Sequence, residues 1–340
     1  MPDLKKILSA SENELLATER ISLKLAQNII SSLKNFNEVK NVVEKEISNI
    51  EKMNAGIITF WDDKYPLLLK NIYSPPLILY TLGDIDLLNN SIIAIVGTRT
   101  PSDYGKIYAE KFSSDLTKSG IVIASGMARG IDSVAHAAAL NSGGKTIAII
   151  GSGLDVVYPP ENRKLFNRIK ESGLIISEYP LGTKPDAPNF PKRNRIISGI
   201  SLGTLVIETR TNGGAIQTAG HALTQNREVF ALPGNLTSQQ SEGTNQLIKR
   251  SEAKLVQNVE DILIELNINS ESPKVNNLSN IELSLFEEKI LDKLSVEPMH
   301  VDNLAEVSSI PVSECLVYLL QLEFKGLVKQ LPGKMFISTY

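Results

Sequence analysis

The sequence is poor in the residues that build disulfides, metal sites and membrane segments. It has one cysteine, Cys315, so no disulfide can form within the chain, and a reducing compartment is the simplest expectation. Its three histidines, His136, His221 and His300, lie far apart, which argues against a metal site of closely spaced ligands. No run of about 18 or more apolar residues is present, and residues 1–6 do not begin an apolar signal segment. We therefore expect a cytoplasmic protein without membrane contact, metal or other cofactor.

Positive charge is also scarce. The 340 residues include 35 Lys and Arg against 38 Asp and Glu, a formal net charge of −3. This balance disfavours a protein that coats nucleic acid with its whole surface, but it allows a local basic groove. With 42% apolar and 21% charged residues, the composition is that of a folded chain of two or three domains. If nucleic acid is the ligand, the basic residues must cluster in one place.

The chain divides into a helical module, a main domain, a linker and a small C-terminal domain, at residues 1–55, 56–266, 267–280 and 281–340. In the first segment, apolar residues at helical spacing over 14–33 and 39–50 predict helices, as in SAM or helix-hairpin-helix modules. The linker is polar and rich in Asn and Ser. The last segment predicts a winged helix-turn-helix domain, because three helical patterns precede a β-hairpin. These patterns cover 282–294, 301–307, 311–322 and 327–337.

In the main domain, short apolar runs alternate with helical stretches. The runs expected as strands are 92–96, 121–124, 146–150, 174–176, 205–207 and 229–231, preceded by strand-like pieces at 57–60 and 77–80. The stretches expected as helices are 104–118, 132–141, 162–171, 194–200 and 215–224. Apolar runs bounded by glycine suit strands that are buried on both faces of a sheet. The alternation predicts an α/β fold with an extended Rossmann-like, doubly wound and mostly parallel sheet.

Small and basic residues gather in the loops that follow these strands. The first loop is Gly97-Thr98-Arg99, where glycine permits close approach to a ligand and the next helix offers unpaired amides to a phosphate. It lacks the dinucleotide fingerprint GxGxxG, and a plain tight turn is the alternative. The second loop holds Gly126 and Arg129 and leads to Asp132, which could be a simple helix N-cap. His136 is better explained as a buried histidine than as a catalytic one.

Two further loops add cations. Gly153 follows the next strand, and Arg163 and Lys164 open the helix after it, with a solvated surface position as their alternative. The densest basic patch is Phe190-Pro191-Lys192-Arg193-Asn194-Arg195, which can neutralise several phosphates while Phe190 or a nearby tyrosine stacks a base. The alternative is a helix start whose cations pair with acids such as Glu208.

A fifth loop, 209–215, repeats the pattern with Gly213-Gly214 before a helix. All five loops can fall at the carboxyl edge of one sheet, and this convergence predicts a DNA-binding groove. No serine or cysteine has a convincing base, so no catalytic residue is expected. The candidate DNA-binding residues are Gly97, Thr98, Arg99, Gly126, Arg129, Gly153, Arg163, Lys164, Lys192, Arg193, Asn194, Arg195, Gly213 and Gly214.

Several longer motifs, in this order along the chain, resemble the bacterial DNA-processing protein A family, known as DprA or Smf. They are Val96-Gly97-Thr98-Arg99, Ser125-Gly126-Met127-Ala128-Arg129-Gly130-Ile131-Asp132 with Ala135-His136, Ser177-Glu178-Tyr179-Pro180, Phe190-Pro191-Lys192-Arg193-Asn194-Arg195-Ile196-Ile197 and Val229-Phe230-Ala231-Leu232-Pro233-Gly234. The tail, with Pro332-Gly333, resembles the family's winged-helix domain. The resemblance implies a Rossmann-type protein that binds single-stranded DNA, usually as a homodimer, and loads the RecA recombinase onto incoming DNA in natural transformation. It implies DNA contacts at 97–99 and at Lys192, Arg193 and Arg195, and no enzymatic activity.

The chain departs from the family pattern at three places. Gly213-Gly214-Ala215 stands where Ser-Gly-Ser is common, which removes hydroxyls that could help to hold a phosphate. Gln217 occupies a position that is usually aliphatic, and Glu252 replaces a common glycine. None of these changes conflicts with the expected fold.

Two alternatives stay open. Gly203-Thr204 with Glu208 partly matches the Pro-Gly-Gly-x-Gly-Thr-x-x-Glu motif of lysine-decarboxylase-like phosphoribohydrolases, so a nucleotide hydrolase is the competing function. The predicted recognition helix of the winged-helix domain has Glu314 and Glu323 and only Lys325 as a cation, which favours a protein contact or a regulatory role over duplex binding.

Overall fold

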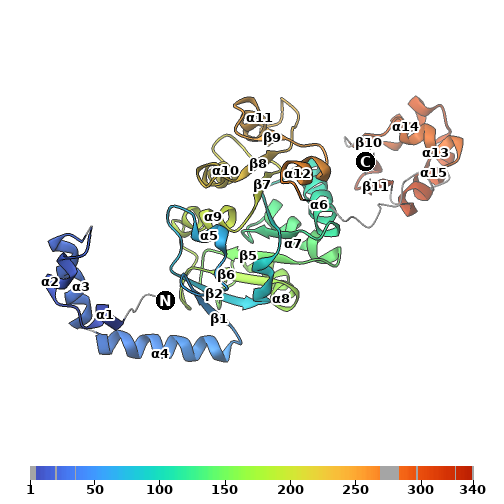
Figure 1. Cartoon of the computed structure of the whole chain (residues 1–340). Helices are drawn as coiled ribbons and strands as arrows, with labels where there is room; N and C mark the ends of the chain where they lie inside the picture. Colours follow the sequence, from blue (N-terminus) through green and yellow to red (C-terminus); the bar gives the residue numbers. More distant parts are fainter. Residues whose placement is uncertain are drawn as a thin grey trace.

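The computed structural model describes residues 5–19, 21–34, 36–268, 283–295, 298–325 and 327–338. A central α/β domain follows a helical module and precedes a small domain of helices and strands (Figure 1). The predicted linker, 267–280, lies outside the described residues from position 269 onward. Position 282, where the sequence predicts the start of a helix, also lies outside them.

In the described residues, the central domain is built on a nine-stranded sheet in the order β1-β2-β6-β5-β4-β3-β7-β8-β9. Its strands are β1 (Gly56–Thr59), β2 (Ile78–Gly83), β3 (Ile92–Val96), β4 (Val122–Ser125), β5 (Thr146–Ile150), β6 (Leu174–Ser177), β7 (Gly203–Val206), β8 (Glu228–Ala231) and β9 (Lys254–Leu255). The strands from β6 to β9 across the sheet are parallel, whereas β2 pairs antiparallel with β6 and with β1. The order reverses at β3, with β4 on one side and β7 on the other. The predicted doubly wound, mostly parallel sheet is confirmed.

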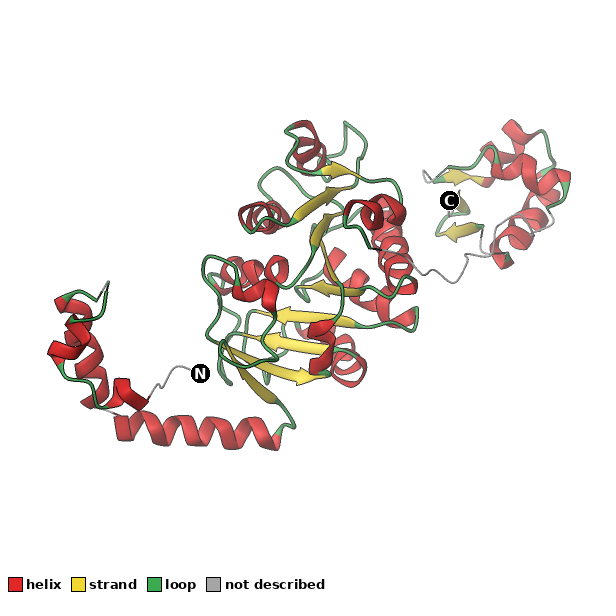
Figure 2. Cartoon of the chain, in the orientation of Figure 1, coloured by secondary structure: helices red, strands yellow, loops and turns green. Residues whose placement is uncertain are grey.

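Helices cover both faces of this sheet and make three layers (Figure 2). One face carries α5 (Leu67–Lys70), α9 (Asn189–Gly199), α10 (Gly214–Thr224) and α11 (Glu242–Lys249). The other carries α6 (Asp103–Lys118), α7 (Ile131–Asn141), α8 (Arg163–Ser172) and α12 (Val259–Glu265). Short 3-10 turns lie at Ile85–Asn89 and Pro160–Asn162.

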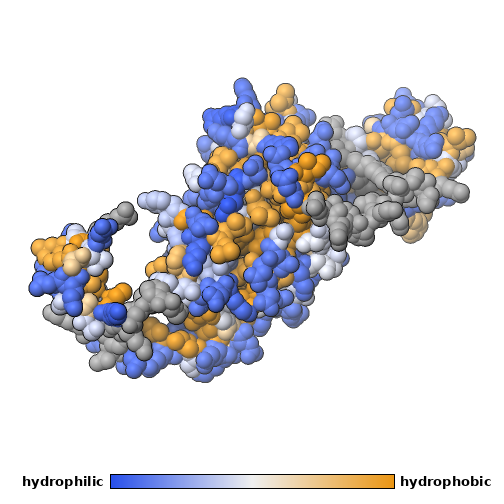
Figure 3. Space-filling view, in the orientation of Figure 1, coloured by the Kyte–Doolittle hydropathy of each residue, from blue (hydrophilic) through white to orange (hydrophobic). Residues whose placement is uncertain are grey.

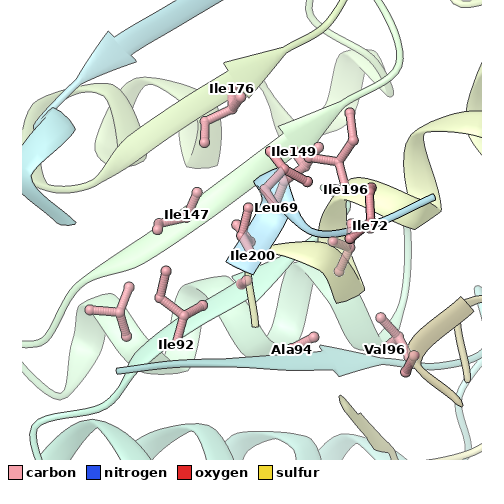
Figure 4. Packing of buried hydrophobic residues seen from close by; sticks show 14 of the residues in the cluster. Leu69, Ile72, Ile92, Ala94, Val96, Ile147, Ile149, Ile176, Ile196 and Ile200 are labelled. Atoms are coloured by element: carbon pink, nitrogen blue, oxygen red, sulfur yellow. The ribbon is translucent and has the colours of Figure 1, made fainter. Parts of the chain in front are cut away.

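Alternate residues of each central strand point to opposite faces. In β3, Ile92, Ala94 and Val96 join the cluster under α5 and α9, while Ile93 and Ile95 join the cluster under α6 and α7. Figure 4 shows the first cluster from close by, with Leu69, Ile72, Ile196 and Ile200 near the strand residues Ile92, Ala94, Ile147 and Ile149. Because both faces are covered, these strands appear in the sequence as continuous apolar runs.

Besides the short 3-10 turns, four elements of the central domain are missing from the sequence prediction. They are α5, which lies between β1 and β2, and α11, β9 and α12, which follow β8. The two residues of β9 are too few to show a strand period, and α11 begins with Glu242-Gly243-Thr244, which has no apolar pattern. In addition, β7 begins two residues before the predicted strand, because Gly203 pairs with Ile93 of β3 and with Glu228 of β8.

The N-terminal module consists of α1 (Lys5–Leu8), α2 (Glu12–Leu16), α3 (Leu23–Lys34) and α4 (Phe36–Lys52). The predicted helical pattern over 14–33 is divided between α2 and α3, and Ser22 accepts the Leu25 amide at 3.3 Å at the start of α3. The end of α4 packs on the central domain. Its Ile50 is 2% exposed, and Glu46 accepts the Leu181 amide at 2.7 Å.

The C-terminal domain has the winged-helix elements in the predicted order. They are α13 (Leu285–Leu291), β10 (Met299–His300), α14 (Val301–Ser308), α15 (Val312–Phe324), β11 (Val328–Leu331) and β12 (Met335–Ser338), and β10, which the sequence did not predict, pairs with β12. Cys315 is fully buried in the core of this domain. Among the described residues, no single helix is long and apolar enough to cross a membrane. Only α14 and α15 counted together, at a bend of 103°, reach that length and composition.

Candidate functional site

The chain after β3 enters α6 on one face of the sheet, and the chain after the neighbouring strand β7 enters α10 on the other face. A crevice therefore opens at the carboxyl edge between these two strands. A cavity of about 520 Å³ lies there, lined by Tyr158 and by residues from 96–99, 128–132, 185–197 and 209–218. Its volume falls within the usual range for ligand pockets, about 300–1,000 Å³. Figure 3 shows hydrophilic and hydrophobic patches interspersed over the visible face of the domain.

In the first predicted loop, the protein itself fixes the backbone. The Thr98 amide donates to the Glu208 carbonyl at 2.7 Å, and the Thr98 carbonyl accepts from the Ile131 amide at 3.2 Å. A Cβ on Gly97 would lie 2.5 Å from Ile131 Cγ1, so this glycine lets β3 and α7 approach closely. Thr98 thus offers no free amide to a ligand. The exposed side chain of Arg99, in contrast, lines the cavity.

Asp132 and Arg193 hold the second loop in place from within the protein. The Asp132 carboxylate accepts from the amides of Gly126 at 3.0 Å and Ala128 at 3.4 Å. The Arg193 guanidinium, 4% exposed, donates to the carbonyl of Gly126 at 2.7 Å and to that of Ile149. Burial raises the pKa of Asp132, against the opposing effect of the Arg193 charge. Burial lowers the pKa of Arg193 to about 10, so its guanidinium remains charged at neutral pH.

These contacts correct two expectations. Arg193 is not a solvent-facing cation of a basic loop but a buried residue that lines the cavity. The reason is that α9 begins at Asn189, five residues earlier than predicted, with Pro191 in its first turn, where an amide hydrogen is not needed. Asp132 does not cap α7, because Gly130 takes the N-cap position and Asp132 binds amides of the preceding loop instead.

His136 is the buried histidine that the sequence favours. Its side chain is fully buried, and its Nδ1 lies 2.6 Å from Thr146 Oγ1. Because the Thr146 hydroxyl already donates to the Ile123 carbonyl at 2.7 Å, Nδ1 carries the proton. Burial lowers the pKa of His136 to about 3, so the ring is neutral at neutral pH. His136 does not line the cavity, and its role is structural.

The fifth predicted loop supplies a helix N-terminus. Gly213 is the N-cap of α10 and provides no side-chain hydrogen bond, so the first-turn amides of Gly214 and Ala215 have no capping partner. A Cβ on Gly214 would meet nothing within 4 Å, and Gly214 lines the cavity. Arg210, which is exposed, lines the same cavity. Arg210 belongs to the predicted loop 209–215, but the residues predicted from that loop were only its glycines, Gly213 and Gly214.

Two aromatic rings form one wall of the cavity. The ring centres of Tyr158 and Phe190 lie 5.5 Å apart, and the guanidinium carbon of Arg99 lies 5.9 Å from the centre of the Phe190 ring. A small hollow continues beside them and is also lined by Gly126 and Arg129. Arg129 pairs there with Glu161. The sequence predicted Phe190 as a stacking residue because it belongs to the basic motif. It did not single out Tyr158, which was covered only by the expectation of a nearby tyrosine.

Five of the predicted residues line neither hollow: Gly153, Arg163, Lys164, Lys192 and Arg195. The Gly153 amide donates to the Thr183 carbonyl at 3.0 Å. Arg195 forms a partly buried ion pair with Glu178 at 2.5 Å. For this residue the alternative of pairing with an acid therefore applies, although the acid is Glu178 and not Glu208. Arg163, Lys164 and Lys192 are exposed cations on α8 and α9.

The glutamate of the hydrolase-like motif is buried and does not line the cavity. Glu208 is 1% exposed, and its carboxylate accepts from the Ser102 amide at 2.9 Å and from the Ser102 hydroxyl at 2.5 Å. Among the described residues, no group of three or more His, Cys, Asp or Glu could hold a metal ion. In the described part of the chain, Asp132 is the only acid that lines the cavity, whereas three arginines line it: Arg99, Arg193 and Arg210. The arrangement therefore suits the binding of an anion with an aromatic part.

Known proteins match most of the chain. A sequence profile described as DNA recombination-mediator protein A matches residues 56–267, and one described as DprA winged helix domain matches residues 278–334. Protein Smf of Escherichia coli is 37% identical over 298 residues, which cover 86% of this chain and 79% of that protein. DNA processing protein DprA of Streptococcus pneumoniae is 44% identical over 204 residues, 60% of this chain and 72% of that protein.

Two solved structures share the fold at substantial identity. The X-ray structure of DprA from Streptococcus pneumoniae matches with a TM-score of 0.66 at 36% identity, over 75% of this chain and 86% of that chain. The second structure is DNA processing protein A from Helicobacter pylori, and its description concerns how that protein binds single-stranded DNA. It matches with a TM-score of 0.57 at 31% identity, over 63% of this chain and 95% of that chain. The chain therefore belongs to the DNA recombination-mediator protein A family, the DprA and Smf proteins.

Proposed function

We propose that the chain binds single-stranded DNA in the cavity between β3 and β7 and delivers the strand to a RecA-type recombinase in the cytoplasm during natural transformation. One observation carries the binding step. Arg99 and Arg210, with the first-turn amides of α10, meet the rings of Tyr158 and Phe190 in a single cavity. Phosphate and base are the two parts of a nucleotide, and the cavity has groups for both.

Each group has a separate task in this proposal. The exposed Arg99 and Arg210 pair with phosphates and release counterions, which makes the affinity depend on salt. Phe190 and Tyr158 stack an unpaired base, an interaction of about 1–3 kcal/mol that tolerates any sequence. Arg193 and Asp132 keep the loop between β4 and α7 in shape.

Family membership supports the delivery step, since the matching profile is described as a recombination mediator. The Helicobacter pylori relative is described as binding single-stranded DNA, which supports the choice of ligand.

We further propose that the chain acts as a homodimer. The edge strand β9 and the neighbouring α12 expose Leu255 and Ile264, which are 42% and 72% exposed, and offer an apolar surface at the end of the sheet.

We propose a binding role without catalysis. Of the described residues, no Ser, Cys or His lines the cavity. Thr98, Thr209 and Thr218 do line it, but the carboxylate of Asp132 is engaged by two amides, so no hydroxyl there has a free base beside it. The same holds for Glu208, which Ser102 occupies. A nucleotide hydrolase would need one of these carboxylates to face its substrate.

The binding step is tested by fluorescence anisotropy of a labelled oligo-dT strand over a salt series. Arg99→Ala, Arg210→Ala and Phe190→Ala should each weaken binding, and each arginine change should lower the salt slope by about 0.7. Arg250→Ala is the matched control, because Arg250 is exposed and lines neither hollow. If the wild-type chain does not bind at low salt, the proposal is wrong, and release of base from nucleoside monophosphates becomes the next assay.

A second set of variants tests the predicted residues outside the cavity. Arg163, Lys164 and Lys192 are proposed to extend the path of the strand, so replacing them with alanine should weaken the binding of long strands but not of strands of a few nucleotides.

The delivery step is tested by RecA filament growth on a strand covered by a single-strand-binding protein. The wild-type chain should accelerate growth, and the double variant Arg99→Ala/Arg210→Ala should not.

A further inference from the structure

Two carboxamide side chains line the cavity without using their hydrogen-bonding groups inside the protein. They are Asn194 on α9, which is half-buried, and Gln217 on α10, which is exposed. Among the described residues, neither carboxamide donates or accepts a hydrogen bond. The hydroxyls of Thr209 and Thr218, which also line the cavity, instead donate to backbone carbonyls at 3.2 and 3.4 Å. The two carboxamides therefore keep their donors and acceptors for a ligand.

The fold brings both carboxamides to the aromatic wall from neighbouring helices. Asn194 follows Phe190 by four residues in α9, so the two side chains leave the same face of that helix. The edge of a base that stacks on the Phe190 ring then faces Asn194. Gln217 lies near the beginning of α10, which packs beside α9, and the Gln225 side chain donates to the Arg195 carbonyl between these helices at 3.0 Å.

Two carboxamides match one base better than the others. A carboxamide places a donor beside an acceptor, so it pairs with a base edge that has an acceptor beside a donor. Adenine has such an edge twice, at N6 with N7 and at N6 with N1. Guanine has two acceptors, O6 and N7, on the corresponding outer edge, and the pyrimidines have no ring nitrogen there. On the edges away from the sugar, only adenine offers a matching pair to each of two carboxamides.

We propose that Asn194 and Gln217 read the base that stacks on Phe190 and Tyr158, and that they favour adenine at this position of the bound strand. The inference rests on the proposed function and deepens it, because it assigns a base preference to a single-strand site. Stacking adds affinity whatever the base, and contacts to phosphates carry no sequence information. The two carboxamides supply the difference between bases.

The test compares short labelled oligo-dT strands that differ only in the central nucleotide, which is dA, dC, dG or dT. The dA strand should bind about tenfold tighter than the dT strand, which is the size of effect that one bidentate contact to adenine provides. Equal affinity for the four strands overturns the inference and leaves single-strand binding intact. Tightest binding of the dG strand also overturns it, because arginines would then read the base. Failure of every strand to bind overturns the proposed function itself.

Two analogues of adenine test the contacts atom by atom. An analogue with carbon in place of N7 keeps only one of the two matching pairs, so its strand should lose part of the preference. Unsubstituted purine lacks the amino group that both pairs share, so its strand should bind no tighter than the dT strand. A preference that survives both changes contradicts the proposed contacts.

Substitutions locate the contacts in the protein. Gln217→Leu and Asn194→Leu keep much of the side-chain volume but remove the carboxamide, so each should reduce the preference for the dA strand. Because Gln217 is exposed, its replacement leaves the packing of the core unchanged. Gln257→Leu is the matched control and should keep the preference, because Gln257 is exposed and lines neither hollow. A preference that persists in the double variant Asn194→Leu/Gln217→Leu shows that other groups read the base and refutes the assignment.

Discussion

Replacing Arg193 with methionine removes the buried guanidinium that joins α9 to the ends of β4 and β5. The guanidinium donates to the carbonyls of Gly126 and Ile149 and lies in the field of the buried Asp132 carboxylate. Methionine keeps much of the side-chain volume but leaves Asp132 without its compensating charge. Removing one partner of a buried charge pair costs about 3–5 kcal/mol, so we expect Arg193→Met to lower the free energy of unfolding by about 3 kcal/mol.

Urea denaturation followed by tryptophan fluorescence measures this loss in the central domain, because the only tryptophan of the chain, Trp61, lies there. Arg193→Met should lower the transition midpoint. The double variant Asp132→Asn/Arg193→Met should recover part of the loss, with a coupling of about 0.5–3 kcal/mol. If Arg193→Met is as stable as wild type and only single-strand binding is lost, Arg193 is a direct DNA contact and the reasoning is refuted.

Three further predictions concern His136, Gly97 and Cys315. The pKa of His136 is about 3 in the folded chain and about 6.5 in the unfolded chain. The unfolded state therefore binds more protons as the pH falls below about 6.5, and the free energy of unfolding should fall by about 2 kcal/mol from pH 7 to pH 5. His136→Gln should flatten that part of the pH profile in urea titrations, and an unchanged slope would mean that His136 is not the titrating group. Gly97→Val should lower the free energy of unfolding by about 1–3 kcal/mol and the melting temperature with it, because the added side chain clashes with Ile131. Equal melting temperatures would contradict the close packing. Cys315 should react with a thiol reagent only in denaturant, since it is fully buried, and fast native labelling would show an open winged-helix core.

The sheet was predictable because its central strands are buried on both faces. The runs 92–96 and 146–150 coincide with β3 and β5 residue for residue, and glycine-bounded loops mark where each strand ends. Short or capped elements were not predictable in the same way. The strand β9 has two residues, and the break between α2 and α3 depends on one serine, Ser22, inside an otherwise helical pattern.

The site was predicted as a set of loops but not as a set of contacts. Topology alone brings Arg99, Asn194 and Gly213-Gly214 to one cavity, because parallel strands end at one edge. The sequence does not show which way each turn of α9 faces. The prediction therefore did not foresee that Arg193 is buried and that Arg195 pairs with Glu178. Arg210 entered the cavity from a loop that was recognised only for its glycines.

The measurement that tests the central claim most directly is photo-crosslinking of a single strand that carries iodouracil, followed by mass spectrometry of the attached peptide. We predict attachment at Phe190 or Tyr158, and its loss when unlabelled single strand competes. Attachment confined to α8 or to the winged-helix domain, with none at these two rings, would contradict the placement of the strand in the cavity between β3 and β7.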